Sequence, residues 1–267
     1  MTQTPTIVDT HAHIYHRGMP LAPGAWHAPT TEATLEQYLT TLDAHGVGFA
    51  VLAAASIFGT FNHYAIEACR RHRRLRTTVI LSPDCKLATM RELARQGVVG
   101  VRFQWRGVGS QPDLGSAEYR RFLRRVAELG WHVQLHDDSA RLAAPLAELE
   151  ASGVNIVIDH LGRPGTPSGT ACPGFQALLR SVAKGRTWVK LSAAFRLPSR
   201  ELAQQVAAVL LREAGPDRLL WGSDWPFTAF ESTMDYGQAL ADLTRLVPDP
   251  VARHRIACET PLQLHFS

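Results

Sequence analysis

Histidines and an aspartate stand where short apolar runs of this sequence end. The first run closes with Val-Asp-Thr-His-Ala-His, in which His11 and His13 are two residues apart. Side chains two apart on an extended chain project to the same side, so these two imidazoles should point together. His136 ends another run, His160 follows a third, and Asp224 follows a fourth. A lone histidine is more often structural, but four imidazoles and a carboxylate in equivalent places predict one site that could bind Zn²⁺ or Mn²⁺.

Arginines occupy comparable positions. Arg102 ends one apolar run, Arg163 comes three residues after His160, and Arg196 lies just beyond a later run. Guanidinium groups that converge on a pocket bind carboxylates through paired hydrogen bonds. Each arginine could instead form a surface ion pair, but three at successive run ends favour a small anionic substrate. Ser56 could add a hydrogen bond to that substrate or serve only its own loop.

These side chains need a scaffold that brings the ends of distant segments together. Eight apolar runs predict strands over residues 7–9, 49–53, 77–81, 98–102, 132–136, 154–158, 188–191 and 219–222. Amphipathic segments between them predict helices over residues 34–45, 117–129, 142–151, 175–183 and 201–213. Apolar strands that alternate with helices are typical of a parallel sheet buried on both faces. Eight such units predict an α/β protein with a single (β/α)8 (TIM) barrel, whose active site lies at the carboxyl ends of the strands.

An open, doubly wound sheet is the alternative fold. It usually has fewer strands and often a glycine-rich phosphate turn, and this sequence has no Gly-x-Gly-x-x-Gly after the first run. A serine hydrolase is not expected either, because the Gly-x-Ser-x-Gly motif is missing. The length of 267 residues, with 45% hydrophobic content, matches one barrel domain spanning residues 1–267.

The composition of the chain limits which partners and which cellular compartment we expect. The longest apolar run, residues 49–58, is about half of the ~20 residues that a membrane helix needs, so no membrane span is expected. No export signal is evident at the start, and four dispersed cysteines suggest reduced thiols, so the expected location is the cytoplasm. The pI of 9.1 could suggest nucleic acid. However, the basic residues gather at 70–74 and 120–125, where a helix would present them to solvent, so no nucleic-acid partner is expected.

Three motifs resemble those of a known family. Val-Asp-Thr-His-Ala-His near the start, Ile-Asp-His-Leu-Gly-Arg-Pro at 158–164 and Leu-Leu-Trp-Gly-Ser-Asp-Trp-Pro at 219–226 resemble the amidohydrolase superfamily, in its amidohydrolase-2 branch. Within that branch the sequence is most similar to the 2-pyrone-4,6-dicarboxylate hydrolases and sugar lactonases, over nearly the whole chain. The resemblance implies a (β/α)8 barrel whose members hydrolyse lactones, although some relatives decarboxylate or isomerise their substrates.

The resemblance also implies roles for individual residues. In the pyrone hydrolases the aspartate after the eighth strand acts as general base on water, and its equivalent here is Asp224. Histidines of the first and sixth strands polarise the lactone carbonyl, which implies that role for His11, His13 and His160. Arginines hold the substrate carboxylates, which implies that role for Arg102, Arg163 and Arg196.

The sequence departs from the family pattern at three positions. The pyrone hydrolases work without metal and lack a histidine at the end of the fifth strand, where this chain has His136. That histidine could contact the substrate or complete a metal-ligand set. Binuclear members carry a carbamylated lysine at the end of the fourth strand, where Arg102 stands here, so the resemblance implies one divalent metal or none. Phe227 stands where relatives often have histidine, which leaves the substrate open.

Three hypotheses for function follow. The leading one is hydrolysis of a carboxylated lactone, such as a 2-pyrone-4,6-dicarboxylate or a sugar-acid lactone, by water that Asp224 activates. The alternative is metal-dependent decarboxylation of an aromatic or muconate-type acid. A third is a barrel that binds a small carboxylate without chemistry, against which the intact His-x-His motif argues. A homodimer is compatible with all three, because barrels of this kind often dimerise.

Overall fold

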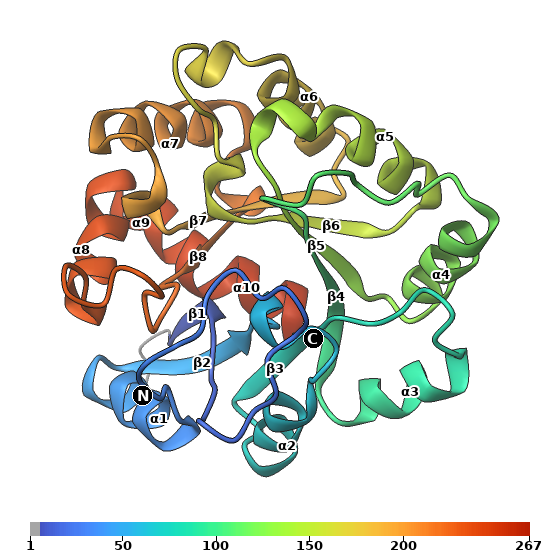
Figure 1. The fold of residues 1–267 in the computed structure, drawn as a ribbon. Coiled ribbons are helices and arrows are strands. Elements are labelled where there is room, and N and C mark those ends of the chain that lie inside the picture. The colour runs from blue at the N-terminus through green and yellow to red at the C-terminus, as the bar shows by residue number, and fades with distance from the viewer. Residues whose placement is uncertain (1–5) are drawn as a thin grey trace.

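Eight parallel strands form the inner wall of the computed structural model, which describes residues 6–267 (Figure 1). Their bounds are β1 (Ile7–Ala12), β2 (Val47–Leu52), β3 (Leu75–Val79), β4 (Val98–Gln104), β5 (His132–His136), β6 (Asn155–Ile158), β7 (Thr187–Ser192) and β8 (Leu219–Gly222). Each strand pairs in parallel with the next, in the order β1 to β8, which confirms the (β/α)8 barrel. Residues 1–5, part of the segment in which no export signal is expected, lie outside the described residues.

The barrel closes where the end of β1 meets the segment that follows β8. The backbone N–H of Asp224 donates to the carbonyl of His11 over 2.7 Å, and that of His13 donates to the carbonyl of Trp225 over 2.8 Å. Gly222 permits this approach, because a Cβ atom there would lie only 2.6 Å from the Cβ of His11. The closure therefore places the first and last sequence motifs side by side.

Helices cover the outside of the barrel (Figure 1). They are α1 (Leu35–Ala44), α2 (His63–Arg71), α3 (Leu87–Arg95), α4 (Ala117–Glu128), α5 (Ala143–Ser152), α6 (Pro173–Ala183), α7 (Arg200–Ala214), α8 (Tyr236–Leu246), α9 (Pro250–His254) and α10 (Thr260–His265). The five helices expected from amphipathic segments are all present, with limits close to those expected. Thr34 explains one limit, because its side chain and that of Gln37 each accept the backbone N–H of the other residue and fix the start of α1.

β1 and β4 extend two or more residues beyond the carboxyl ends of their apolar runs. The first strand was expected to end at Asp9, but it continues through His11 to Ala12, with an irregular register against β2 between Asp9 and Ala12. The fourth strand likewise passes Arg102 and ends at Gln104, which pairs with the last residue of β5. The added residues include polar side chains, so an apolar pattern does not reveal these extensions. The neighbouring strands decide that these residues belong to the sheet.

One basic run does not lie in a single helix, contrary to expectation. α2 ends at Arg71, and the carbonyl of Arg74 accepts the backbone N–H of Ala50, so the chain has already joined the sheet there. The run at 120–125 does lie in α4, where Phe122 and Val126 are buried and the arginines at 120, 121 and 124 are exposed. The second run is therefore a solvated helix face, as expected.

The two ends of the barrel differ in accessibility. α10 packs against the end formed by the amino termini of the strands: the ring of His265 lies 5.0 Å from that of His132, and the ring of Phe266 lies 5.0 Å from that of Phe49. The opposite end carries the predicted site residues. Within residues 6–267, no disulfide joins the cysteines and no helix is both long and apolar enough to cross a bilayer.

Candidate active site

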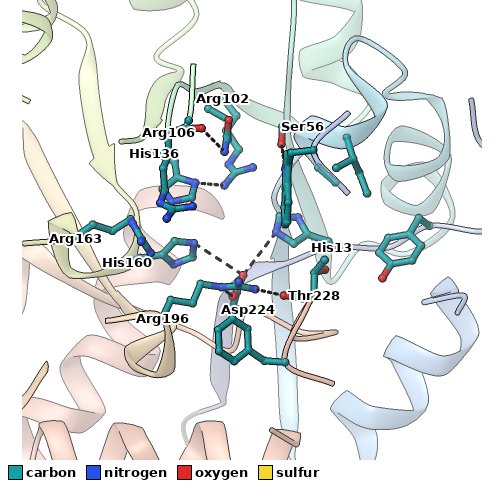
Figure 2. A pocket seen from close by; sticks show the side chains of 17 residues that line it. His13, Ser56, Arg102, Arg106, His136, His160, Arg163, Arg196, Asp224 and Thr228 are labelled. Carbon is teal, nitrogen blue, oxygen red and sulfur yellow. Dashed lines mark hydrogen bonds and ion pairs between the residues drawn. The ribbon is translucent and has the colours of Figure 1, made fainter. Parts of the chain in front are cut away.

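A cavity of about 260 Å³ opens at the carboxyl ends of the strands (Figure 2). Most residues singled out in the sequence line it, namely His13, Ser56, Arg102, His136, His160, Arg163, Arg196 and Asp224. His11 does not line the cavity, because it is completely buried next to Asp224. The fold thus brings all the predicted site residues to one end of the barrel.

Three histidines face one oxygen of Asp224. The Nε2 atoms of His11, His13 and His160 lie 3.6, 3.7 and 4.0 Å from Asp224 Oδ1. Figure 2 shows Asp224 between His13 and His160. Asp224 and His160 both have left-handed backbone, with φ of 66° and 53°. Residues other than glycine rarely adopt this backbone conformation, and such strain is concentrated at functional sites.

The opposite ring nitrogens of His11 and His13 have acceptors as partners. His11 Nδ1 lies 3.2 Å from Asp159 Oδ1, and His13 Nδ1 lies 2.7 Å from the carbonyl oxygen of Ala53. A carbonyl can only accept, so in the neutral His13 ring the proton is on Nδ1. Lys190 Nζ and Gln134 Nε2, which can only donate, lie 3.3 and 3.4 Å from His11 Nδ1, but the ionised carboxylate of Asp159 is nearer and favours the same tautomer for His11. The Nε2 atoms therefore present lone pairs toward Asp224.

Burial keeps the histidines of the site uncharged. It lowers the pKa of His11, His136 and His160 well below the usual imidazole range. Burial, together with the charge of Arg102, lowers the pKa of His13 to about 3. At neutral pH all four rings are neutral, and each can offer one nitrogen lone pair.

Asp159, to which the sequence analysis gave no role, organises the floor of the site. This completely buried carboxylate accepts two hydrogen bonds from Arg102 on Oδ2, at 3.2 and 3.0 Å. Gln134 Nε2 lies 2.9 and 3.0 Å from its two oxygens, and Lys190 Nζ lies 3.6 Å from Oδ1. Burial acts to raise the pKa of Asp159, but His11, Lys190 and Arg102 outweigh it and hold that pKa well below the usual range. An ionised Asp159 therefore orients His11.

Lys190 and Gln134 are polar residues in the interior of the barrel that the sequence analysis missed. Lys190 Nζ donates to the carbonyl of Thr10 over 2.7 Å and lies 3.3 Å from His11 Nδ1. Burial lowers the pKa of this lysine to about 8. Each residue interrupts an apolar strand, and that interruption is the signal that could have revealed them, because buried polar groups need partners.

A second buried carboxylate, Asp9, ties the two halves of the site together. Its oxygens accept from the Ser223 hydroxyl at 2.5 Å and from the hydroxyls of Tyr38 and Tyr236 at 2.9 Å each. They also accept the backbone N–H of Ser223 at 2.9 Å and that of His11 at 3.1 Å. Asp9 thus fixes β1, α1 and α8 to the segment after β8, and it sets where His11 stands.

Arg196 holds the oxygen of Asp224 that the histidines do not face. Its Nε lies 2.6 Å from Asp224 Oδ2, and its Nη2 donates to the carbonyl of Thr228 over 2.9 Å. The guanidinium carbon also lies 5.1 and 5.0 Å from the ring centres of Phe195 and Phe230. Burial raises the pKa of Asp224 above its usual value, and Arg196 acts against that rise. One oxygen of Asp224 is therefore paired with a guanidinium, while the other faces the imidazoles.

The other arginines differ in how far they are already paired. Arg102 is only 4% exposed, and Asp159 occupies its guanidinium. Arg163 and Arg106 share one carboxylate oxygen, because their Nε atoms lie 3.0 and 3.4 Å from Asp138 Oδ1. Arg106, which the sequence analysis did not single out, lines the cavity with Arg163. Two guanidiniums on one carboxylate leave a positive charge at this side of the cavity.

His136 and Ser56 lie on opposite sides of the cavity (Figure 2). The ring of His136 is 4.7 Å from that of His160, and its Nδ1 is 3.5 Å from Arg102 Nη2. Its Nε2 is buried and has no hydrogen-bond partner among the described residues. Ser56 Oγ accepts a long hydrogen bond of 3.4 Å from the indole of Trp26. A substrate role for either residue stays a prediction.

Some of these ligand atoms are grouped closely enough for a metal ion. Those of His11, His13 and Asp224 lie within 4.8 Å of one another, as do those of His11, Asp159 and His160, and His136 belongs to neither group. His11 Nε2 is buried with no hydrogen-bond partner in residues 6–267, which leaves its lone pair available. Neutral imidazoles with a carboxylate are ligands that Zn²⁺ accepts. The first group therefore fits one divalent ion.

Comparison with known proteins finds a matching family and several relatives. Residues 8–265 match the family model of the amidohydrolases. The chain is 30% identical to a 4-sulfomuconolactone hydrolase of Rhizobium radiobacter, over 96% of this chain and 88% of that protein. It is 27% identical to a 2-pyrone-4,6-dicarboxylate hydrolase of Comamonas testosteroni, over 97% of this chain and 90% of that protein.

A solved structure extends the likeness to three dimensions. The chain superimposes with a TM-score of 0.91 on a Pseudomonas putida protein that is provisionally assigned as a 2-pyrone-4,6-dicarboxylic acid hydrolase. The two are 38% identical, and the match covers 98% of each chain. Both the fold and the length of the two proteins therefore correspond.

Proposed function

This chain belongs to the amidohydrolase family, and we propose that it is a hydrolase that opens the ring of a carboxylated lactone with water activated by Asp224. The observation that carries the proposal is Asp224 Oδ1, a buried carboxylate oxygen that faces three neutral imidazoles at an arginine-lined cavity. The lactone hydrolases among its relatives support the same reaction.

The reaction needs one base and one donor. Asp224 takes a proton from water, and the resulting hydroxide forms a bond to the lactone carbonyl carbon. The ring C–O bond then breaks, and the proton passes from Asp224 to the departing oxygen, which leaves a hydroxy acid from a saturated lactone or an enol acid from an unsaturated one. When no ion is bound, the lone pairs of His11 and His13 can accept a hydrogen bond from the water; when an ion is bound, they are its ligands. His160 can donate Nε2–H to the developing oxyanion, because its Nδ1 lies 2.9 Å from a hydroxyl, Ser192 Oγ, that can donate to it.

The charges around the cavity suit an anionic substrate. Arg102 and Lys190 surround Asp159, and Arg196 faces Asp224, so these buried groups carry a net positive charge. The pair Arg106 and Arg163 on Asp138 adds a further positive charge, as noted above. Substrate carboxylates would bind on this side, with the lactone carbonyl directed toward Asp224.

We further propose that His11, His13 and Asp224 hold one divalent ion. Such an ion would polarise the lactone carbonyl and lower the pKa of a nearby water. Adding Zn²⁺ or Mn²⁺ to chelator-treated protein should raise its melting temperature, because a ligand that binds the folded state stabilises it. The variant His13→Ala should lose this rise. An equal rise in the variant His63→Ala and in His13→Ala would place the ion elsewhere, because His63 is an exposed residue of α2.

Hydrolysis of a panel of carboxylated lactones tests the main proposal. We expect acid release in a pH-stat, with a product heavier than the substrate by one water and no CO2. Asp224→Asn should lower kcat by about 10²-fold or more, because it removes the base but keeps the shape. Asp217→Asn makes the same change at an exposed position and should leave kcat unchanged. Normal turnover in Asp224→Asn would refute the role of Asp224, and CO2 as product would favour a decarboxylase.

A further inference from the structure

The cavity has two chemically different sides. Arginines and histidines from the ends of β4 to β7 form one of them, as Figure 2 shows for Arg102, Arg106 and His136. The segments that follow β1 and β2 form the other side of the cavity. The side chains that line this side are mostly apolar: Tyr15, Trp26, Ala55 and Ile57, with Ser56. A ligand in this cavity therefore meets charge on one side and a mainly apolar surface on the other.

Trp26 is the exposed member of the apolar side. Tyr15 and Ile57 are 2% and 4% exposed, because they belong to a small core together with Phe58. The indole of Trp26, in contrast, is 61% exposed although it lines the cavity. An exposed aromatic ring at the mouth of a binding cavity is a surface that a ligand can cover.

The segment that carries Trp26 is anchored on both sides of the residue. Tyr15 and Ala33 exchange two backbone hydrogen bonds of 2.7 and 3.0 Å, and the N–H of Ala22 donates to the carbonyl of Ile57 over 2.8 Å. The indole Nε1 also donates to Ser56 Oγ over 3.4 Å. These contacts hold the indole at the mouth of the cavity, although it is not packed into the core.

We propose that Trp26 determines specificity by stacking on the flat ring of an unsaturated, carboxylated lactone. A planar ring can lie against the indole while its carboxylates reach the arginines on the other side. A puckered sugar-acid lactone has no flat π face to lie against the indole, and its hydroxyl groups would meet a side that offers them little beyond Ser56 Oγ. The inference rests on the proposed lactone hydrolysis, and it selects unsaturated lactones over sugar lactones as the substrate class.

A pair of non-reacting ligands tests the stacking independently of hydrolysis. Benzene-1,3-dicarboxylate and cis-cyclohexane-1,3-dicarboxylate carry the same charges, but only the first is flat. Calorimetry should show that Trp26→Ala weakens binding of the flat ligand by about five- to tenfold and leaves the puckered ligand unchanged. Trp26→Phe should retain most of the preference. Leu21→Ala is the matched control, because Leu21 lies in the same segment, is 46% exposed and does not line the cavity.

Kinetics on two lactones provide the second readout. For 2-pyrone-4,6-dicarboxylate we expect Trp26→Ala to raise KM with little change in kcat, and for a saturated sugar-acid lactone we expect neither to change. Equal effects on the flat and puckered ligands, or an equal effect of Leu21→Ala, would overturn the inference about Trp26. If the wild type hydrolyses neither of these nor any other lactone of the panel, the proposed function fails, and the binding preference still decides whether Trp26 stacks on flat acids.

Discussion

The two buried carboxylates of the site differ in how their charge is balanced. Asp159 is surrounded by Arg102, Lys190 and Gln134, and its pKa lies well below the usual range despite burial. Asp224 has one guanidinium on one oxygen, and burial raises its pKa. Environments that separate two pKa values in this way assign different tasks to the groups. Asp159 is suited to orient His11, and Asp224 is suited to exchange a proton.

The ion pair of Arg196 with Asp224 should set the acid limb of the pH profile. Burial raises the pKa of Asp224 and Arg196 lowers it, so Arg196→Met should move that pKa further up. A general base acts only when it is deprotonated, and the acid limb of kcat/KM should therefore shift to higher pH. The measurement is kcat/KM between about pH 4 and pH 9 for the wild type and the variant.

Arg196→Lys separates charge from shape in this experiment. A lysine keeps the positive charge near Asp224, so its acid limb should shift less than that of Arg196→Met. If activity falls by the same factor at every pH in both variants, Arg196 binds substrate and does not control the protonation of Asp224.

At the scale of elements, the junction of β1 and β8 determines the geometry of the site. Asp9 accepts hydrogen bonds from Ser223, Tyr38 and Tyr236, and one backbone hydrogen bond joins His11 to Asp224 directly. The histidines of the first motif and the base of the last motif are therefore placed by one contact between strands, and it depends on Gly222.

Gly222→Ala should disrupt that contact. The added Cβ would lie 2.6 Å from the Cβ of His11, so the two strands must move apart. A displacement of about 1 Å at a reacting group can cost about 10²-fold in rate, and overpacking costs about 1–3 kcal/mol of unfolding free energy. We expect both losses in kinetic and urea-denaturation measurements. Gly109→Ala is the control, because nothing lies within 4 Å of a Cβ there, and wild-type rates in Gly222→Ala would contradict this role.

The sequence predicts the elements well where local pattern decides them. β5 and β8 begin and end as their apolar runs indicate, because both runs are buried from end to end. The irregular end of β1 depends on its partner strands, so no local pattern reveals it. The same holds within the site. The ends of strands identified Asp224 and His160, whereas the role of Lys190 depends on Thr10 and Asp159, which are distant in sequence.

At the scale of the whole molecule, the two ends of the barrel have different roles. The open end carries the cavity, and α10 packs against the other end, where His132 and His265 are buried. Neither nitrogen of His265 has a hydrogen-bond partner among the described residues, nor has Nε2 of His132. In a (β/α)8 barrel the end opposite the active site contributes to the stability of the fold rather than to catalysis. Substitution of these two histidines should therefore change stability and not the reaction.

This buried pair should make the protein lose stability in acid. Burial lowers the pKa of His132 to about 3 and that of His265 well below its usual range. The unfolded chain therefore binds protons at these residues near pH 6.5, before the folded chain does. The contribution of these two neutral histidines to the free energy of unfolding is complete above that pH and is lost progressively as the pH falls toward 3. His265→Leu should flatten the decline in unfolding free energy between about pH 6 and pH 4, by up to one proton in slope.

Urea denaturation at a series of pH values measures that slope. His63→Leu is the matched control, because His63 is exposed at the start of α2 and its loss removes no buried imidazole. The other buried histidines of the site still titrate on unfolding, so His265→Leu should reduce the acid loss without abolishing it. A slope equal to that of the wild type would mean that His265 takes up its proton in the folded state, in which case the closed end of the barrel admits charge that its packing should exclude.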